Sequence, residues 1–391
     1  MNHRRLFTGL IFCICVPLLP ACRRTTTPPM LCSDAKNVLV EQKFPVNGRE
    51  ETRWILCMEA AEKQYGLIIR QAFFRKTPSS PWLLVIGEAR VAEIFVPYHH
   101  AADDGDPSRF SDVSYASYSM ASIGAADCPA SVGGQRIGDT VCKEVHDRGI
   151  AWKDKNNVRR GQEMVLWGVL DAANYNYIME WTFRDDGTVM GRVGATGQNI
   201  DDMPHMPHMH TIVWRLDIDL NGAQSDSASI ETHAENVLTA DDTEMPVAEE
   251  MQLKWDPQAF TSVQVSDRTL VNGQGNKSYY QLIALPTGGV SRHDEPYTNF
   301  DFWVTTNHEM EFIPKSLPQY VSGPPESGSE STSNTDIVLW YKGAIHHHPS
   351  DEDGEMRHEG GKDVWHGQAL VMWTGFMLKP HNVFDRTPFY P

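Results

Sequence analysis

The segment His208-Met209-His210-Thr211-Ile212-Val213-Trp214-Arg215-Leu216-Asp217 contains the strongest signal for the fold of this chain. Its β-branched and aromatic residues are typical of a β-strand. Successive side chains of a strand point to opposite faces of the sheet, so His208 and His210 are expected to point the same way. One ion could then be bound by both imidazoles. The segment therefore predicts a strand that carries part of a copper or zinc site.

Similar short segments, alternating or rich in aromatic residues and separated by turn signals, occur along most of the chain. They cover residues 65–74, 82–96, 163–170, 177–183, 189–193, 211–220, 279–285, 300–305, 336–341 and 369–378. Asp185-Asp186-Gly187 lies between two of them and predicts a hairpin turn, because Asp-Gly readily adopts positive φ angles. Long helical periodicity is almost absent. We therefore expect an all-β fold, one large antiparallel β-sandwich with few short helices.

The first 21 residues have the features of a signal peptide. Met-Asn-His-Arg-Arg is followed by an apolar run at residues 6–19, which is too short for a permanent membrane-spanning helix. The run ends in Leu19-Pro20-Ala21-Cys22, which resembles a bacterial lipoprotein signal in which Cys22 would be lipidated. Simple secretion is the alternative. Either way the protein is expected to be exported, to the cell envelope or beyond it.

The composition of residues 23–48 is dominated by Thr, Pro, Ser and charged residues, which suits a tether. We therefore predict a signal peptide at 1–21, a tether at 22–48 and one folded body at 49–391. Within that body, residues 322–334 and the acidic, His-rich residues 351–366 are expected to be mobile surface loops.

The cysteines predict disulfides in an oxidising compartment. Seven occur, two of them in the signal peptide. If Cys22 carries a lipid, four remain, namely Cys32, Cys57, Cys128 and Cys142, and they permit three pairings. Short loops close most readily, which favours Cys32 with Cys57 and Cys128 with Cys142.

The charge of the chain argues against nucleic acid as a partner. Lys plus Arg is 34 and Asp plus Glu is 51, giving a net charge of -17. No basic tract follows the first few residues, and a nucleic-acid-binding surface needs one. A cationic substrate would be attracted to such a surface, although acidity is also an ordinary way for proteins to stay dispersed.

A further source of histidine lies far downstream, in Gly343-Ala344-Ile345-His346-His347-His348-Pro349. Two histidines from one strand and a remote third, with water completing the coordination, are typical of a redox or Lewis-acidic metal with an open position. A triple histidine before Asp351-Glu352-Asp353 is also common in a solvated loop. The tract Met203-Pro204-His205-Met206-Pro207-His208-Met209-His210 favours a metal, because thioether and imidazole donors together are biased toward copper.

Together with Asn174-Tyr175-Asn176-Tyr177, these residues resemble the catalytic domain of the copper-containing amine oxidases, from residue 54 to residue 391. That family oxidises the tyrosine of an Asn-Tyr-Asp/Glu motif to topaquinone, using bound copper and oxygen. The resemblance implies that Tyr175 is modified in this way and that Asn174 belongs to the catalytic set. Residues 181–188, 194–197 and 375–380 are also similar to segments of the family.

The resemblance also implies the copper ligands. His208 and His210 match the family's His-x-His, which is likewise followed by Arg-Leu-Asp. The third ligand is expected to be His347 rather than His346, because counting from Trp340 and counting back from residues 352–353 both give 347. The family's intradomain disulfide corresponds to Cys128 with Cys142.

Two further residues match the family's catalytic machinery. Tyr98 ends a Val-Pro-Tyr strand, and Asp112 follows fourteen residues later. The resemblance implies that Asp112 is the general base and that Tyr98 hydrogen-bonds the quinone oxygen. Without it, Asp112 would be taken as an ordinary turn aspartate and Tyr98 as a strand-end aromatic residue.

A second metal site of oxygen ligands is also implied. Asp217 and Asp336 would contribute their carboxylates, and Ile218 and Ile337 their backbone carbonyls, to a calcium or manganese ion. The alternative is that these aspartates are strand-end residues facing water.

The implied activity is the oxidation of a primary amine by O2 to an aldehyde, with ammonia and hydrogen peroxide, by a homodimer whose only contact with a membrane is a lipid anchor. Asn176 departs from the family's Asp or Glu, and Asp171 departs from a common threonine. Two other hypotheses compete: a copper-binding lipoprotein that never forms the quinone, and an extracellular recognition sandwich without metal.

Overall fold

The structure is a computed structural model. It describes residues 32, 34–46, 49–60, 65–98, 108–113, 118–199, 206–233, 242–256, 259–285, 293, 295–308, 311, 313–317, 321 and 330–386. Among these residues no helix is both long enough and apolar enough to pass through a membrane. The signal peptide, Cys22 and the first part of the predicted tether lie outside the described residues.

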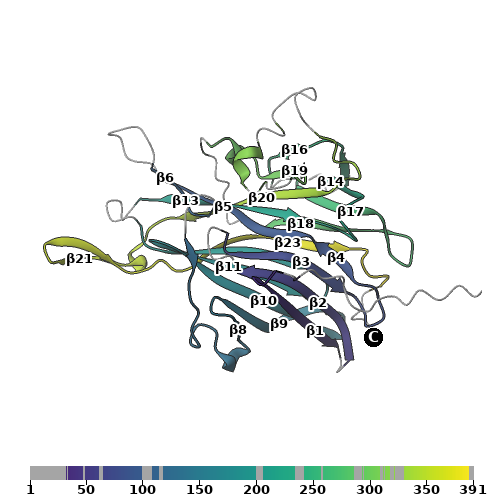
Figure 1. Ribbon diagram of the computed structural model, residues 1–391, viewed down its shortest axis with the longest axis horizontal. Helices are drawn as coiled ribbons and strands as arrows, with labels where there is room; N and C mark the ends of the chain where they lie inside the picture. The colour runs from purple at the N-terminus through teal and green to yellow at the C-terminus, as the bar shows by residue number, and fades with distance from the viewer. Residues whose placement is uncertain are drawn as a thin grey trace, which may run out of the picture.

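The described residues form two large antiparallel sheets (Figure 1). The first has the order β1-β2-β3-β5-β13-β20-β19-β16, with β4 paired to β3 and β6 paired to β5. Its strands are β1 (Asn37–Val46), β2 (Arg49–Ala60), β3 (Leu67–Arg75), β4 (Leu83–Ile86), β5 (Glu88–Tyr98), β6 (Ser108–Ser111), β13 (His208–Asp217), β16 (Met251–Leu253), β19 (Phe302–Thr306) and β20 (Ile337–His347).

The second sheet has the order β15-β14-β17-β18-β23-β12-β11-β10-β9-β8, with β7 paired to β10. Its strands are β7 (Ser119–Met120), β8 (Gln135–Ile137), β9 (Val141–Lys153), β10 (Val158–Ala172), β11 (Tyr175–Arg184), β12 (Val189–Gly197), β14 (Asp226–His233), β15 (Asp242–Val247), β17 (Ser262–Val271), β18 (Lys277–Leu285) and β23 (Met372–His381). The described residues also include short 3₁₀ turns: η1 (Ala130–Val132), η2 (Pro296–Asn299), η3 (Pro314–Ser316) and η5 (Asp351–Asp353).

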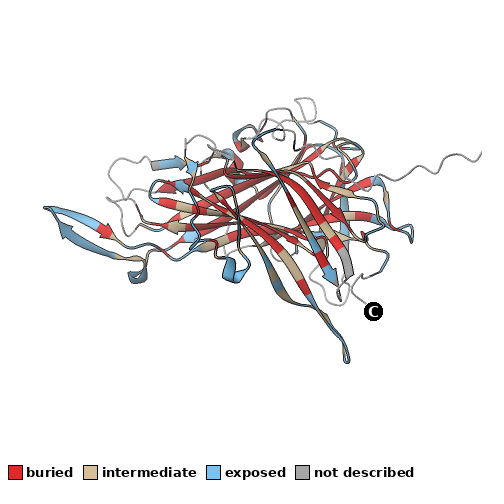
Figure 2. Cartoon of the chain, turned by 60° about the horizontal axis from the view of Figure 1, so that its bottom comes forward, coloured by how far each residue is buried: buried red, intermediate tan, exposed pale blue. Residues whose placement is uncertain are grey.

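The two sheets pack face to face over one aromatic core, which Figure 2 shows as buried residues along the strands. Trp54 of β2 contacts Phe183 of β11 at a ring separation of 5.1 Å, and Trp214 of β13 contacts Phe376 of β23 at 5.6 Å. Alternation in each strand supplies these inward residues, and burying them contributes most of the stabilisation. The predicted all-β sandwich is therefore confirmed.

The predicted Asp-Gly hairpin is also present. β11 and β12 pair from Tyr175 opposite Gly197 to Phe183 opposite Val189, and Gly187 lies between them with φ of 89°. A Cβ at residue 187 would lie 3.1 Å from the ring of Phe74, which is a tight contact, and the left-handed backbone at this position itself favours glycine.

Two segments differ from the sequence prediction. The tether was expected to reach residue 48, but Asn37–Val46 forms β1, because its alternating Val40 and Phe44 are buried against the core next to β2. The predicted loop at 351–366 contains an exposed hairpin of β21 (Glu355–Glu359) and β22 (Lys362–His366), which projects from the body (Figures 1 and 2). Its Gly360 and Gly361 supply the positive φ angles of the turn.

Both predicted disulfides are formed. Cys32 is bonded to Cys57 of β2, with an S–S distance of 2.03 Å, and Cys128 is bonded to Cys142 of β9. The first bond attaches the segment before β1 to the neighbouring strand, so the folded body begins near residue 32 rather than at residue 49.

Candidate metal centre

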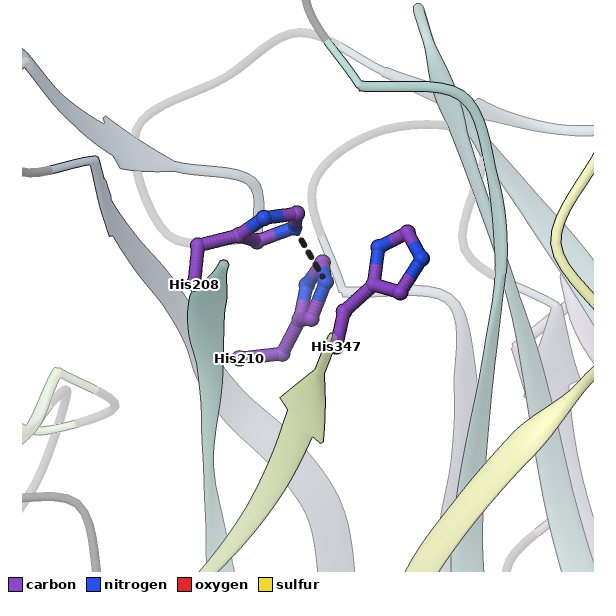
Figure 3. Close-up of side chains that lie close together, drawn as sticks. All are labelled: His208, His210 and His347. Atoms are coloured by element: carbon purple, nitrogen blue, oxygen red, sulfur yellow. Dashed lines mark hydrogen bonds between the residues drawn. The ribbon is translucent and has the colours of Figure 1, made fainter. Parts of the chain in front are cut away.

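β13 and β20 are antiparallel neighbours, and their pairing brings the three predicted copper ligands together. His208 lies directly opposite His347, and the two strands remain paired over ten residues to Asp217 opposite Val338. The rings of His208, His210 and His347 point toward a common point (Figure 3). One nitrogen from each ring lies within 4.8 Å of the others, and the side chains are 0–3% exposed.

In each of the three rings, the nitrogen remote from this point has a partner of its own. His208 Nδ1 donates to the carbonyl of Met206 at 3.0 Å, and His347 Nε2 donates to Asp353 Oδ2 at 3.0 Å. The Tyr177 hydroxyl donates its one proton to Asp112, so it accepts the proton of His210 Nδ1 at 3.0 Å. The lone pairs of His208 Nε2, His210 Nε2 and His347 Nδ1 are therefore directed at the shared point, as metal ligation requires.

Burial also keeps the rings of His208 and His210 neutral. It lowers the pKa of His208 to about 4, and it lowers the pKa of His210 well below its ordinary value. A neutral imidazole retains the lone pair that a metal needs, whereas a protonated one does not. Three closely spaced imidazole nitrogens with ordered outer partners fit copper or zinc.

Tyr175 reaches the same point from the opposite sheet. Its hydroxyl lies 3.1 Å from His208 Nε2 and 2.5 Å from His347 Nδ1, and the residue is 2% exposed. Burial, followed by the nearby Tyr98, raises the pKa of its phenol, so the group is neutral without a metal. Asn199, which the sequence analysis did not identify, accepts a 3.4 Å hydrogen bond from this hydroxyl.

The turn before β11 positions Tyr175. Ala173 has φ of 60°, and the side chain of Asn174 donates to the carbonyl of Gln198 at 2.7 Å. Gly197 lies opposite Tyr175, and a Cβ there would be 2.4 Å from the carbonyl oxygen of Asn174. Asn174 thus supports the turn that places the phenol, and Gly197 leaves the space for it.

Asp112 lies beside this group as predicted, and it is connected to the histidines by a residue that the sequence analysis missed. The Tyr177 hydroxyl contacts both Asp112 Oδ2, at 2.6 Å, and His210. Burial raises the pKa of Asp112 to about 6, while the Tyr177 hydrogen bond opposes the shift. Alternation along β11 could have identified Tyr177, since it shares a face with Tyr175.

Tyr98 also lies at the site. Its ring stacks on His208 with centroids 4.4 Å apart, and its hydroxyl is 3.3 Å from His208 Nε2. Burial raises the pKa of Tyr98, and a hydrogen bond with Asn174 opposes that shift.

A second cluster lies at the other end of the same two strands. Asp217, Asp219 and Asp336 place one carboxylate oxygen each within 4.8 Å of the others. Each has a buried Oδ1 without a hydrogen-bond partner, and burial raises the pKa of Asp217 and Asp219. Orphaned, closely spaced carboxylates are destabilising unless a cation joins them, so they fit a hard divalent ion. The predicted Asp217 and Asp336 are thus joined by Asp219, which the sequence analysis missed.

The backbone of Ile218 and Ile337 runs through this cluster, because each isoleucine adjoins one of its aspartates. A further buried aspartate lies close by. Asp226 is 0% exposed and neither carboxylate oxygen has a partner; burial, followed by Asp219, raises its pKa to about 9. This residue was not predicted either.

A groove of about 490 Å³ lies on the outer face of the second sheet, away from both clusters. Its carboxylates are already paired: Glu144 with His146, Glu163 with Arg184, and Glu180 with Arg192. The groove therefore has no unpaired carboxylate among these lining residues, unlike the cluster of Asp217, Asp219 and Asp336.

The fold and site together define a class: large β-sandwich metalloproteins with a buried three-histidine centre beside a tyrosine. A family model described as copper amine oxidase, enzyme domain, matches residues 53–390. The chain belongs to the copper amine oxidase family.

Relatives with known names are similar at low identity. Copper-containing amine oxidase gamma 1 of Arabidopsis thaliana is 24% identical, over 86% of this chain and 56% of the relative. Human copper-containing diamine oxidase is 24% identical over 59% of this chain and 35% of its own length. The chain thus spans about half the length of the plant relatives, 56% for the first.

Solved structures agree on the fold. A copper-containing benzylamine oxidase from Hansenula polymorpha superposes with a TM-score of 0.64 at 17% identity, covering 89% of this chain and 62% of that one. A lysyl oxidase from Pichia pastoris gives a TM-score of 0.64, covering 89% of this chain and 55% of that one.

Proposed function

We propose that this protein is a primary-amine oxidase, converting a primary amine, O2 and water to an aldehyde, ammonia and hydrogen peroxide. The observation that carries the proposal is the position of the Tyr175 hydroxyl, 3.1 Å from His208 Nε2 and 2.5 Å from His347 Nδ1. A copper ion held by the three histidines would be adjacent to the ring that must be oxidised.

Standard side chains offer no electrophile able to accept two electrons, so the reaction needs a carbonyl cofactor. Topaquinone formed from Tyr175 would supply that electrophile, and copper held by His208, His210 and His347 would supply redox chemistry with O2. The burial of Tyr175 and its contact with Asn199 restrict the ring to one region of the site.

Asp112 is the proposed general base, removing a proton from the carbon next to the substrate nitrogen. A carboxyl with a pKa of about 6 is largely ionised at neutral pH, yet it is a stronger base than an exposed aspartate. Tyr177 holds its Oδ2 by a 2.6 Å hydrogen bond and is therefore a positioning residue. Tyr98 and Asn174 would orient the modified ring, from their places beside His208 and at the turn before Tyr175.

The two departures from the family motif lie on the other face of β11. Asp171 and Asn176 are directly paired across β10 and β11, whereas Tyr175 and Tyr177 point to the core and the metal site. This placement supports quinone formation in spite of the altered motif, because neither side chain is on the metal-facing side.

Quinone redox staining of copper-loaded, aerobically incubated protein tests the proposal, with Tyr175→Phe as the control. We expect the parent protein to stain and the variant not to stain. An unstained parent protein would support the alternative of a copper-binding lipoprotein that keeps the ligands without the cofactor. A peroxide-release assay over aliphatic monoamines, aromatic amines and diamines would then define the substrate class.

We also propose a second metal site, export of the protein, lipidation and a homodimer. A hard cation, calcium or manganese, would bind Asp217, Asp219 and Asp336 with the carbonyls of Ile218 and Ile337. Export, lipidation of Cys22 and a homodimer are also proposed, and metabolic labelling with a fatty acid and sedimentation of the purified protein test the last two. A protein that sediments as a monomer would contradict the dimer.

A further inference from the structure

The strands that carry the buried histidine trio also place a second set of metal-binding side chains on their opposite face. His208 and His210 of β13 point into the core, so Met209 between them points outward. His347 of β20 points inward, so His346 points outward, and His348, which follows the last residue of the strand, is exposed. Met209 lies directly opposite His346 in the β13–β20 pairing.

These three side chains are close to one another. Directly opposed residues on antiparallel strands have Cβ atoms about 5 Å apart, which brings the Met209 thioether within reach of the His346 ring. The rings of His346 and His348 have centroids 6.0 Å apart. In the buried trio the centroid separations of His208 from His210 and His347 are 4.8 and 5.0 Å, so the two exposed rings would have to approach each other by about 1 Å to match it.

Among the described residues, the outer face is less covered at this end of the strands. Around Val213 it is covered by a small core that includes Tyr297, Trp303 and Trp340. Met209 lies four residues away and is half-buried, and His346 and His348 are exposed. An ion arriving from solvent would meet these side chains directly, whereas the trio behind them is buried.

We propose that Met209, His346 and His348 form a second copper site, on the surface, that binds monovalent copper. A thioether is a soft ligand, and soft ligands select Cu(I) over harder divalent ions. The buried trio consists of three histidines and contains no sulfur ligand, so the two faces of the strand pair differ in ligand chemistry. The inference goes beyond the amine-oxidase proposal and does not depend on modification of Tyr175.

Titration with Cu(I) under anaerobic, reducing conditions, against a chromophoric Cu(I) chelator, tests the proposal on the full chain. The double variant Met209→Leu/His346→Gln should bind one Cu(I) fewer than the parent protein. His358→Gln, at an exposed histidine of the β21–β22 hairpin, and Met206→Leu, at a nearby methionine, are the matched controls and should bind as many ions as the parent. Thermal unfolding followed by circular dichroism verifies that each variant is folded.

The single variants locate the ligands. Met209→Leu should weaken Cu(I) and Ag(I) binding at this site by at least about 10–100-fold, the usual cost of losing even an outer-shell metal partner, and leave Zn(II) binding much less affected. His348→Gln should weaken the binding of Cu(I) and Ag(I) and also the binding of Zn(II). The proposal is overturned if the double variant retains the parent's Cu(I) stoichiometry. It is also overturned if Met206→Leu removes the second ion, because the site would then lie elsewhere in the tract.

Discussion

The two ends of the β13–β20 pair hold opposite kinds of metal site. At one end, His208, His210 and His347 present three imidazole nitrogens, and the second nitrogen of each ring has a hydrogen-bond partner. At the other end, Asp217, Asp219 and Asp336 present carboxylates whose Oδ1 atoms have no hydrogen-bond partner. One ladder of ten residue pairs supports both.

The two ends are expected to affect the folding stability of the protein in opposite ways. Neutral imidazoles can be buried and hydrogen-bonded without an ion, so the imidazole end is preorganised at little cost in folding free energy. Buried carboxylates repel one another, so the carboxylate end is destabilising until a cation binds. We therefore expect the imidazole end to govern chemistry and the carboxylate end to govern stability.

The largest effect is expected from His210→Gln. Losing one of three copper ligands should abolish copper retention, quinone staining and turnover, because all three depend on the trio. The carboxylate end should keep its cation. Elemental analysis after dialysis measures both ions, and loss of the calcium or manganese together with copper would show that the two ends are not independent.

Asp112→Asn should have the next largest effect. An amide cannot accept the substrate proton, so turnover should fall about 10²–10⁴-fold, the usual contribution of a general base. Quinone staining should persist, because cofactor formation depends on copper and Tyr175. An equal loss of staining and turnover would show that Asp112 has a role other than that of the general base.

Tyr177→Phe should have a smaller effect, with a characteristic pH dependence. In the parent protein, activity should rise with pH as Asp112 ionises near its pKa of about 6. The Tyr177 hydrogen bond lowers that pKa, so its removal should move the acid limb of the pH–rate profile to higher pH. Tyr280→Phe, another buried tyrosine whose hydroxyl contacts Gly187 instead, is the control. A lower rate with an unmoved acid limb would rule out this coupling.

Asp226→Asn alters the carboxylate end of the strand pair and should give the smallest change in turnover. The pKa of Asp226 is about 9 in the folded protein and about 3.9 in an unfolded chain, so stability is fully present below pH 4 and is lost as pH rises toward 9. In chelator-treated protein, the variant should flatten this dependence and gain up to about 5 kcal/mol over the parent protein between pH 4 and pH 8, at about 1.36 kcal/mol per pH unit.

Urea unfolding at the two pH values measures the effect of Asp226→Asn. Asp363→Asn, in the exposed β21–β22 hairpin, is the control and should follow the parent protein. An unchanged slope of stability against pH in Asp226→Asn would mean that this carboxyl is not a source of the destabilisation.

Much of the imidazole end could be predicted from sequence, because it depends on alternation within one strand and on a recognisable motif. His208 and His210 are two residues apart, and His347, which was predicted as the third ligand in preference to His346, lies directly opposite His208. Tyr175, Tyr98 and Asp112 also lie where the motif predicted them.

The rest depends on distant parts of the chain meeting in space. Tyr177 becomes part of the site because Asp112, in the turn just after β6, reaches its hydroxyl. Asp226 is buried beside the carboxylate cluster through the pairing of β14 with β17 and a bridge to Thr335. β1 was missed because its composition resembles a tether, and its packing against β2 overrides that composition.

The unbroken pairing of β13 with β20 has a further consequence. β13 meets β5 with an irregularity between Val213 and Trp214, but it meets β20 without one over all ten pairs. Inserting or deleting a single residue within β20 would turn that strand over, exchanging His347 for a neighbour and inward chemistry for outward. An insertion in a loop outside the β13–β20 pair leaves this register unchanged, whereas within β20 a change of two residues keeps the alternation and a change of one reverses it unless a bulge absorbs the extra residue.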